Sequence, residues 1–127
     1  MSLRTPLSAA LGRGTARGGV HHWWMQRVSA VALVPLTLWL LCSLLKLPLT
    51  DYAAITTWMT AGWNPLWLAL TVLVMAWHSQ LGVQVVIEDY VHHQALKTAT
   101  LLTVNFAHAL VAAAGVYAVL RIAFRSP

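Results

Sequence analysis

The chain has 127 residues, of which 59% are hydrophobic and only 9% are charged, whereas charged residues make up about 25% of an ordinary soluble domain. This composition excludes a soluble enzyme domain and indicates a small all-α membrane protein. Because Cys42 is the only cysteine, an internal disulfide and a four-cysteine iron–sulfur site are excluded as well.

Residues 1–27 form the first predicted segment, which contains Arg, Ser and Thr but no acidic residue. We predict that it is an inside-facing tail followed by an interfacial segment. The first eighteen residues also resemble a mitochondrial transit peptide in composition, so a mitochondrial location stays open beside a bacterial one.

Residues 28–127 are predicted to form the transmembrane domain, with spans at about 28–47, 65–87 and 98–122. Each span has about the 20 apolar residues that a bilayer crossing needs. Inside lipid the spans must be helices, because every backbone polar group needs a partner within the segment. Pro35 lies inside the first span and predicts a kink there.

Basic residues predict the orientation of the three spans. Five Lys and Arg residues lie on the N-terminal side, namely the four of residues 1–27 and Lys97, and three (Lys46, Arg121 and Arg125) lie on the opposite side. Since the side richer in Lys and Arg usually faces the cytoplasm, we expect the N-terminus inside and the C-terminus outside.

His78 is the most informative residue, because it lies in the middle of the second span. An ionisable side chain at that depth is costly and usually serves ion, proton or cofactor chemistry. Gly82 follows one helical turn later and leaves room for a flat macrocycle beside the helix. The alternatives are that His78 only bonds a neighbouring helix and that Gly82 only allows close helix packing.

Asp89 and Tyr90 end the second span, and Asp89 lies eleven residues after His78, on nearly the same helical face. A phenol at the membrane edge can donate a hydrogen bond to a quinone carbonyl, and a carboxylate beside it can relay protons. Asp51 and Tyr52 form a second such pair, but no histidine precedes them at this spacing. Only the pair at 89–90 therefore belongs to a constellation with a histidine, and the alternative is that it is simply a polar helix end that meets water.

Further candidates lie before the first span and in the third. Arg27 either marks the membrane interface or pairs with an anionic group such as a haem propionate. His108 lies three residues after Asn105, and we favour an interhelical hydrogen bond over a second iron ligand for it. The remaining histidines near the interfaces are expected to be solvated, namely His22, His92 and His93.

Three motifs together resemble the small membrane-anchor subunits of succinate dehydrogenase, respiratory complex II, also called cytochrome b556 small subunits. They are Gly19-Val20-His21, Arg27-Val28-Ser29-Ala30, and His78 followed at the family's spacing by Gly82 and Asp89-Tyr90. The third motif is the most specific. The His-Arg-x-Thr-Gly signature of the companion large anchor is absent, which points to the small anchor.

This resemblance implies that His78 is one axial ligand of a haem b, and that Gly82, His21 and Arg27 lie near the haem. It also implies that Tyr90 and Asp89 help to bind ubiquinone.

The implied partners are the large cytochrome b556 anchor, which would form a second three-helix unit around the haem, and the iron–sulfur and flavoprotein subunits. The chain would be non-catalytic alone and would serve succinate oxidation in the respiratory chain and the tricarboxylic acid cycle. Its implied location is the bacterial inner membrane or, alternatively, the mitochondrial inner membrane.

Two other functions stay open at this point. In a haem-free anchor of a fumarate-reductase-like complex, His78 would be structural. In a small proton-coupled transporter subunit, His78 and Asp89 would form a proton path.

Overall fold

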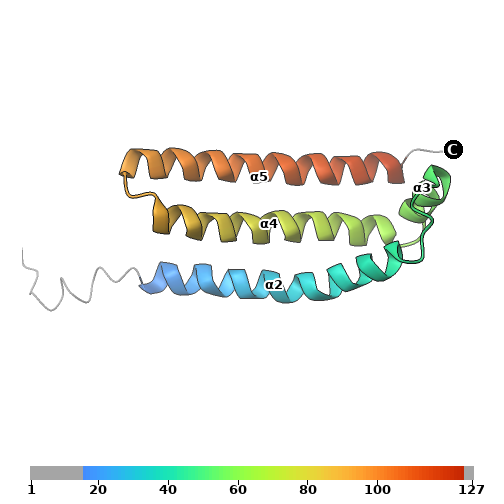
Figure 1. Cartoon of the computed structure of the whole chain (residues 1–127), viewed down its shortest axis with the longest axis horizontal. Helices are drawn as coiled ribbons and strands as arrows, with labels where there is room; N and C mark the ends of the chain where they lie inside the picture. Colours follow the sequence, from blue (N-terminus) through green and yellow to red (C-terminus); the bar gives the residue numbers. More distant parts are fainter. Residues whose placement is uncertain (1–15, 125–127) are drawn as a thin grey trace, which may run out of the picture.

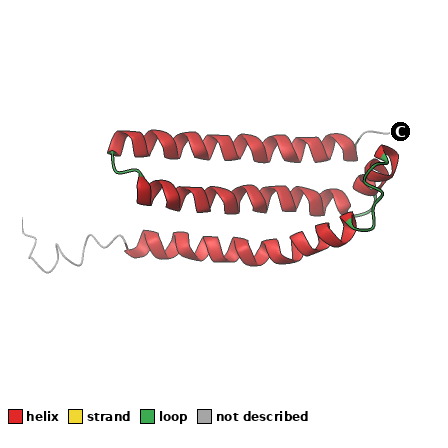
Figure 2. Cartoon of the chain, in the orientation of Figure 1, coloured by secondary structure: helices red, strands yellow, loops and turns green. Residues whose placement is uncertain are grey.

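A computed structural model describes residues 16–124 of the chain, with side chains from residue 19 onward. The helices are α2 (Ala16–Leu44), α3 (Tyr52–Thr60), α4 (Asn64–Tyr90) and α5 (Gln94–Ala123). Short loops join them, and the described part contains no strand (Figure 2). The expected all-α architecture is thereby confirmed.

The three long helices lie side by side in one layer, with α4 in the middle (Figure 1). Helix α4 packs against both neighbours, whereas α2 and α5 do not touch each other within the described residues. The layer therefore has two broad open faces and a very small core of its own. Lipid or another protein must cover these faces, because they are largely apolar.

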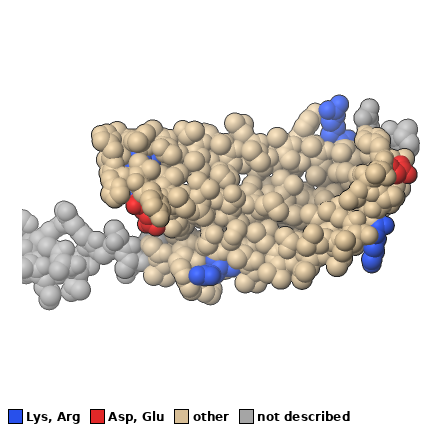
Figure 3. Space-filling model, viewed as in Figure 1, with Lys and Arg blue, Asp and Glu red and all other residues tan. Residues whose placement is uncertain are grey.

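Each long helix contains a segment long and apolar enough to cross a membrane, at Gly19–Leu44, Asn64–Tyr90 and Gln94–Ala123. The three predicted spans are thus confirmed. Charged side chains gather towards the two ends of the layer, and the middle of the face in view has none (Figure 3), as expected for a helix bundle that spans a bilayer.

Helix α2 begins earlier than the first predicted span. It starts at Ala16 and continues without a break to Leu44, so His21 and Arg27 lie on a helix and not in an extended tail. The helix passes through Pro35 and curves in its second half (Figure 1). Residues 1–15 of the expected tail, and Arg125 at the other end, lie outside the described residues.

The connector between the first two spans contains a helix, α3, that the sequence analysis did not predict. The Asp51 carboxylate caps it by accepting hydrogen bonds from the backbone N–H groups of Ala53 (2.9 Å) and Ala54 (3.3 Å). The Trp58 ring of α3 stacks on Trp39 of α2, with ring centroids 5.8 Å apart. Asp51 is therefore a helix cap.

Helices α4 and α5 approach each other closely at Gly115. A Cβ atom on Gly115 would lie only 2.6 Å from Cγ1 of Val72 on α4, which is well inside van der Waals contact. Glycine at this position therefore sets the spacing of the two helices, as small residues commonly do in membranes.

Candidate functional site

His78 lies on the side of α4 that faces α2, and both of its ring nitrogens have partners on that helix. Nδ1 lies 2.9 Å from the Ser29 hydroxyl, and Nε2 lies 3.4 Å from the side-chain amide nitrogen of Gln26. Ser29 is only 1% exposed. The structure thus holds the imidazole in a defined orientation between two helices.

The contacts around His78 fit one tautomer of its ring. When the Ser29 hydroxyl donates to the backbone carbonyl of Gln26, at 3.1 Å, it accepts from Nδ1 of His78. With the Gln26 amide nitrogen facing Nε2, this arrangement puts the proton on Nδ1 and the lone pair on Nε2. Iron ligation requires this tautomer, because metal-binding histidines usually donate their second ring N–H to a protein group.

Gln26 occupies the space between His78 and Gly82. Its amide nitrogen would lie 3.6 Å from a Cβ atom placed on Gly82, so α2 fills the room that the sequence analysis reserved for a macrocycle. The other end of the amide is weakly held, because the Gln26 Oε1 atom is buried and has no hydrogen-bond partner among the described residues. A ligand that replaced Gln26 would therefore break only one long contact, at 3.4 Å.

A cavity of about 500 Å³ opens beside this group, between the N-terminal half of α2 and the C-terminal half of α4. Its lining combines charged, amide, imidazole and indole side chains: Gly19, His22, Trp23, Gln26, Arg27, Gln84, Val85 and Glu88. A cavity with an arginine and an unpaired amide oxygen, that of Gln26, at a membrane interface suits a ligand that carries anionic groups on a flat apolar body.

His22 differs from our expectation. The sequence analysis placed it among the solvated histidines, but it is half-buried and its Nε2 atom is buried without a partner among the described residues. The expectation was wrong because α2 is helical here, which puts His22, Gln26 and Ser29 on one stripe of the helix. That spacing of four and then three residues was the signal in the sequence that could have revealed Gln26.

Arg27 lines the cavity, and its guanidinium lies over the Trp23 ring, 5.4 Å from the ring centroid. This cation–π contact orients the charge without neutralising it. His21 is exposed and does not line the cavity, so of the two residues expected near the haem only Arg27 lies at this cavity.

Asp89 and Tyr90 end α4, about 18 Å of helix beyond His78 at 1.5 Å per residue. Tyr90 is 79% exposed. Neither its hydroxyl nor the Asp89 carboxylate has a hydrogen-bond partner in the part of the chain that the structure describes. Among the described residues both groups are thus without a partner at the end of α4, and neither is in contact with His78.

His108 links α5 to α4, as we expected. Its Nδ1 donates to the Val104 carbonyl (2.8 Å), and its Nε2 lies 3.2 Å from the Ser79 hydroxyl. His92 and His93 are exposed, also as expected, and His93 accepts a hydrogen bond from the Leu96 N–H and so caps α5.

Within the described residues no three His, Cys, Asp or Glu side chains gather into a metal site. His78 could supply one ligand to an iron atom held by a macrocycle. These features define the class of protein: a multi-pass membrane protein whose broad faces are largely uncovered.

Comparison with known proteins agrees with this class. Residues 1–118 match the family model of the succinate dehydrogenase/fumarate reductase transmembrane subunit. The chain is 34% identical over 116 residues to the succinate dehydrogenase hydrophobic membrane anchor subunit of Rickettsia bellii, and the match covers 91% of this chain and 93% of the relative. It is 34% identical over 117 residues to the subunit of the same name from Paracoccus denitrificans, and this match covers 92% of the chain and 90% of the relative.

A third relative is the succinate dehydrogenase membrane anchor subunit of Reclinomonas americana, which is 28% identical over 93 residues, and this match covers 70% of the chain and 77% of the relative. No solved structure matches the chain. The chain belongs to the succinate dehydrogenase/fumarate reductase transmembrane subunit family, and the resemblance inferred from its three motifs is thereby confirmed.

Proposed function

We propose that this chain is the small membrane anchor of a succinate:ubiquinone oxidoreductase. In this role it holds a flavoprotein subunit and an iron–sulfur subunit on the inner membrane face, co-ligates a haem b through His78, and contributes Tyr90 and Asp89 to the ubiquinone site. The observation that carries the proposal is the fixed imidazole of His78, whose Nε2 lone pair lies at mid-membrane depth beside a polar cavity.

The residues around His78 fit a haem. Ser29 can accept a hydrogen bond from Nδ1 in the tautomer that binds iron. Gln26, whose Oε1 is buried and has no partner among the described residues, is the side chain that would move aside. Arg27 offers a guanidinium for a propionate carboxylate, and His22 adds a buried ring nitrogen on the same side of the cavity. We keep His21 as a second candidate near the propionates. When bound, the haem would supply one-electron redox chemistry.

The free side chains at the end of α4 support the quinone assignment. The Tyr90 hydroxyl can donate a hydrogen bond to a quinone oxygen, and the Asp89 carboxylate can pass a proton from water. Both groups lie at the same end of the layer as the Lys97 and Arg27 side chains, which our orientation places at the inner membrane face. This is the side on which soluble partners that oxidise succinate would dock.

The open layer supports a second anchor as partner. His108, the other histidine inside a span, is engaged with the Val104 carbonyl and the Ser79 hydroxyl, and the faces of the layer are largely uncovered. A second three-helix anchor would cover one face and supply the other axial ligand.

The test is purification of the membrane complex through a tag on this chain, with His78→Ala and the matched variant His108→Ala. We expect the wild type to co-purify with a flavoprotein, an iron–sulfur protein and a second anchor, and to show a b-type spectrum. His78→Ala should change the haem spectrum or its EPR signals, whereas His108→Ala should leave them intact because its ring only joins two helices.

Two results would contradict the proposal at different points. An unchanged haem signal at full occupancy in His78→Ala would remove this residue as ligand. A wild-type complex that contains the flavoprotein but no haem would identify a haem-free anchor instead.

A further inference from the structure

A cavity of about 290 Å³ lies between α3 and the C-terminal end of α2 with the turn that follows it. This is the end of the layer opposite to the cavity at Arg27 (Figure 1). Within residues 16–124 the backbone of α3 packs against α4 and α5 but not against α2, so side chains alone fill the space between α2 and α3. The residues that line the cavity are Trp39, Cys42, Ser43, Lys46, Leu47 and Trp58.

Indole rings hold this cavity in shape. Trp39 stacks on Trp58 of α3, and its ring centroid lies 6.0 Å from that of Trp67 on α4. The ring N–H groups of Trp39 and Trp58 have no hydrogen-bond partner among the described residues. Tryptophan favours the membrane interface because its ring packs with apolar groups while its N–H can donate to polar ones. Two unused donors thus lie beside the cavity.

Lys46 is the only charged side chain among the described residues that line the cavity. Its ammonium group has no carboxylate partner in the part of the chain that the structure describes. Asp51, the acidic residue next to it in the sequence, already accepts two backbone N–H groups of α3. The Ser43 hydroxyl donates to the Trp39 carbonyl at 2.8 Å. The cavity therefore carries a positive charge that no anion of the described chain balances.

The depth of Lys46 places it at a layer of lipid phosphates. Lys46 follows Arg27 by nineteen residues along α2 and its last turn, which is about 28 Å of helix. The hydrocarbon core of a bilayer is about 30 Å thick. When Arg27 lies at one headgroup layer, Lys46 therefore lies at the other. The exposed side chains of Leu38, Leu41 and Leu45 continue from the cavity towards the membrane centre and offer a surface for an acyl chain.

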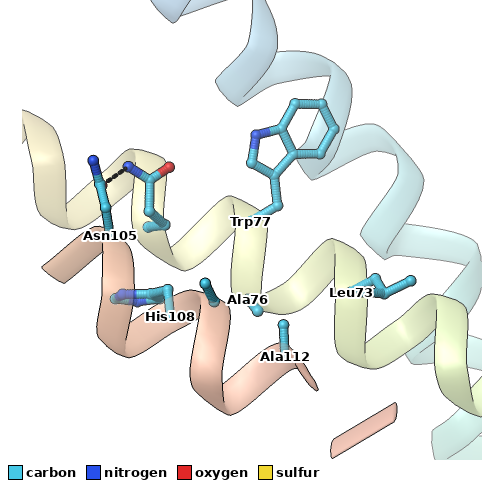
Figure 4. A pocket seen from close by; sticks show the side chains of 8 residues that line it. Leu73, Ala76, Trp77, Asn105, His108 and Ala112 are labelled. Atoms are coloured by element: carbon cyan, nitrogen blue, oxygen red, sulfur yellow. Dashed lines mark hydrogen bonds between the residues drawn. The ribbon is translucent and has the colours of Figure 1, made fainter. Parts of the chain in front are cut away.

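Two other hollows lack this combination of charge and depth. The cavity at Arg27 is also lined by the carboxylate of Glu88, which repels anions. The groove between α4 and α5 lies in the middle of the layer, where Figure 4 shows Asn105 and His108 beside small side chains. The described residues that line this groove include no lysine, arginine or carboxylate, and Asn105 already accepts a hydrogen bond from Gln80 at 2.7 Å.

We infer that the cavity at Lys46 binds the headgroup phosphate of an anionic glycerophospholipid such as phosphatidylglycerol. Lys46 and the two indole N–H groups donate to the phosphate oxygens, and an acyl chain follows α2. A zwitterionic lipid would bring an ammonium group as well, for which the described lining has no carboxylate. The site involves neither His78 nor Tyr90, so it goes beyond the proposed function and stands whether or not the complex binds haem.

The test uses Cys42 as a local reporter, because it is the only cysteine of the chain, is exposed and lines the cavity. The membrane complex is purified through a tag on this chain, freed of lipid in detergent and treated with N-ethylmaleimide. Mass spectrometry of the Cys42 peptide then gives the rate of alkylation. We expect phosphatidylglycerol to slow the alkylation several-fold, whereas equal amounts of phosphatidylcholine or inorganic phosphate should leave it unchanged.

Substitutions of two basic residues test the role of the charge. Lys46→Gln should raise the phosphatidylglycerol concentration needed for protection by about fivefold, which is the contribution of one basic side chain near a headgroup layer. Lys46→Arg should protect as the wild type does. Arg121→Gln is the matched control, because it removes the same charge in the last turn of α5, away from the cavity, and it should leave the protection intact.

Native mass spectrometry of the same preparations counts the bound lipids and gives a second, independent measurement. The wild type and Arg121→Gln should retain one phosphatidylglycerol molecule more than Lys46→Gln does. Equal retention in all three proteins would refute the site at Lys46. Equal protection of Cys42 by phosphatidylcholine would show ordinary boundary lipid, and protection by inorganic phosphate would show a site for small anions; either result would overturn the inference.

Discussion

Replacing Ser29 with alanine isolates the group that orients His78. The change removes one hydroxyl from a site that is 1% exposed and leaves the Nδ1–H of His78 without its acceptor at 2.9 Å. An unsatisfied buried donor costs about 1–3 kcal/mol. Loss of a residue that orients a metal ligand typically costs about 10–100-fold in affinity, which is about 1.4–2.8 kcal/mol. The two estimates agree, so we expect Ser29→Ala to weaken haem binding by about 10–100-fold.

The assay is haem retention by the purified complex during competition with a haem-binding apoprotein, together with the EPR spectrum of the haem. Ser43→Ala is the matched control on α2, because the Ser43 hydroxyl donates only to the Trp39 carbonyl of its own helix, at 2.8 Å. Retention within about twofold of wild type for Ser29→Ala, with an unchanged spectrum, would show that the hydroxyl does not set the tautomer.

Three further predictions concern other parts of the chain. Tyr90→Phe should lower quinone reduction by about one to two orders of magnitude, from a loss of about 1.5–3 kcal/mol, while dye reduction by the soluble subunits stays normal; equal losses in both activities would contradict a quinone role. Gly115→Ala should destabilise the complex to heat by about 1–3 kcal/mol, because Val72 blocks the new methyl group, and adding Val72→Ala should restore stability if the clash is the cause. A reporter that is active only outside should work when fused after the C-terminus and fail in the loop between α4 and α5, and the reverse pattern would place the quinone site on the wrong side.

The sequence determined the number of spans and the family. Three apolar segments of sufficient length must be membrane helices because lipid leaves their backbone no other partner. The spacing from His78 to Asp89 and Tyr90 supported the resemblance to this family, and that resemblance is confirmed. His108 could be predicted as an interhelical link because a polar side chain inside a span needs a partner.

Other features depend on which sides of the helices face one another. The periodicity of a single sequence does not determine these contacts. The structure places Gln26 between His78 and Gly82, where the sequence suggested open space for a macrocycle. It also places His22 at the cavity, whereas the sequence suggested a solvated ring. It also joins Gln80 to Asn105, twenty-five residues apart in the chain. Local patterns fix which segments are helical because backbone hydrogen bonds close within each helix. The rotation and order of the helices follow from contacts between distant side chains, so only the tertiary structure showed that Ser29 orients His78.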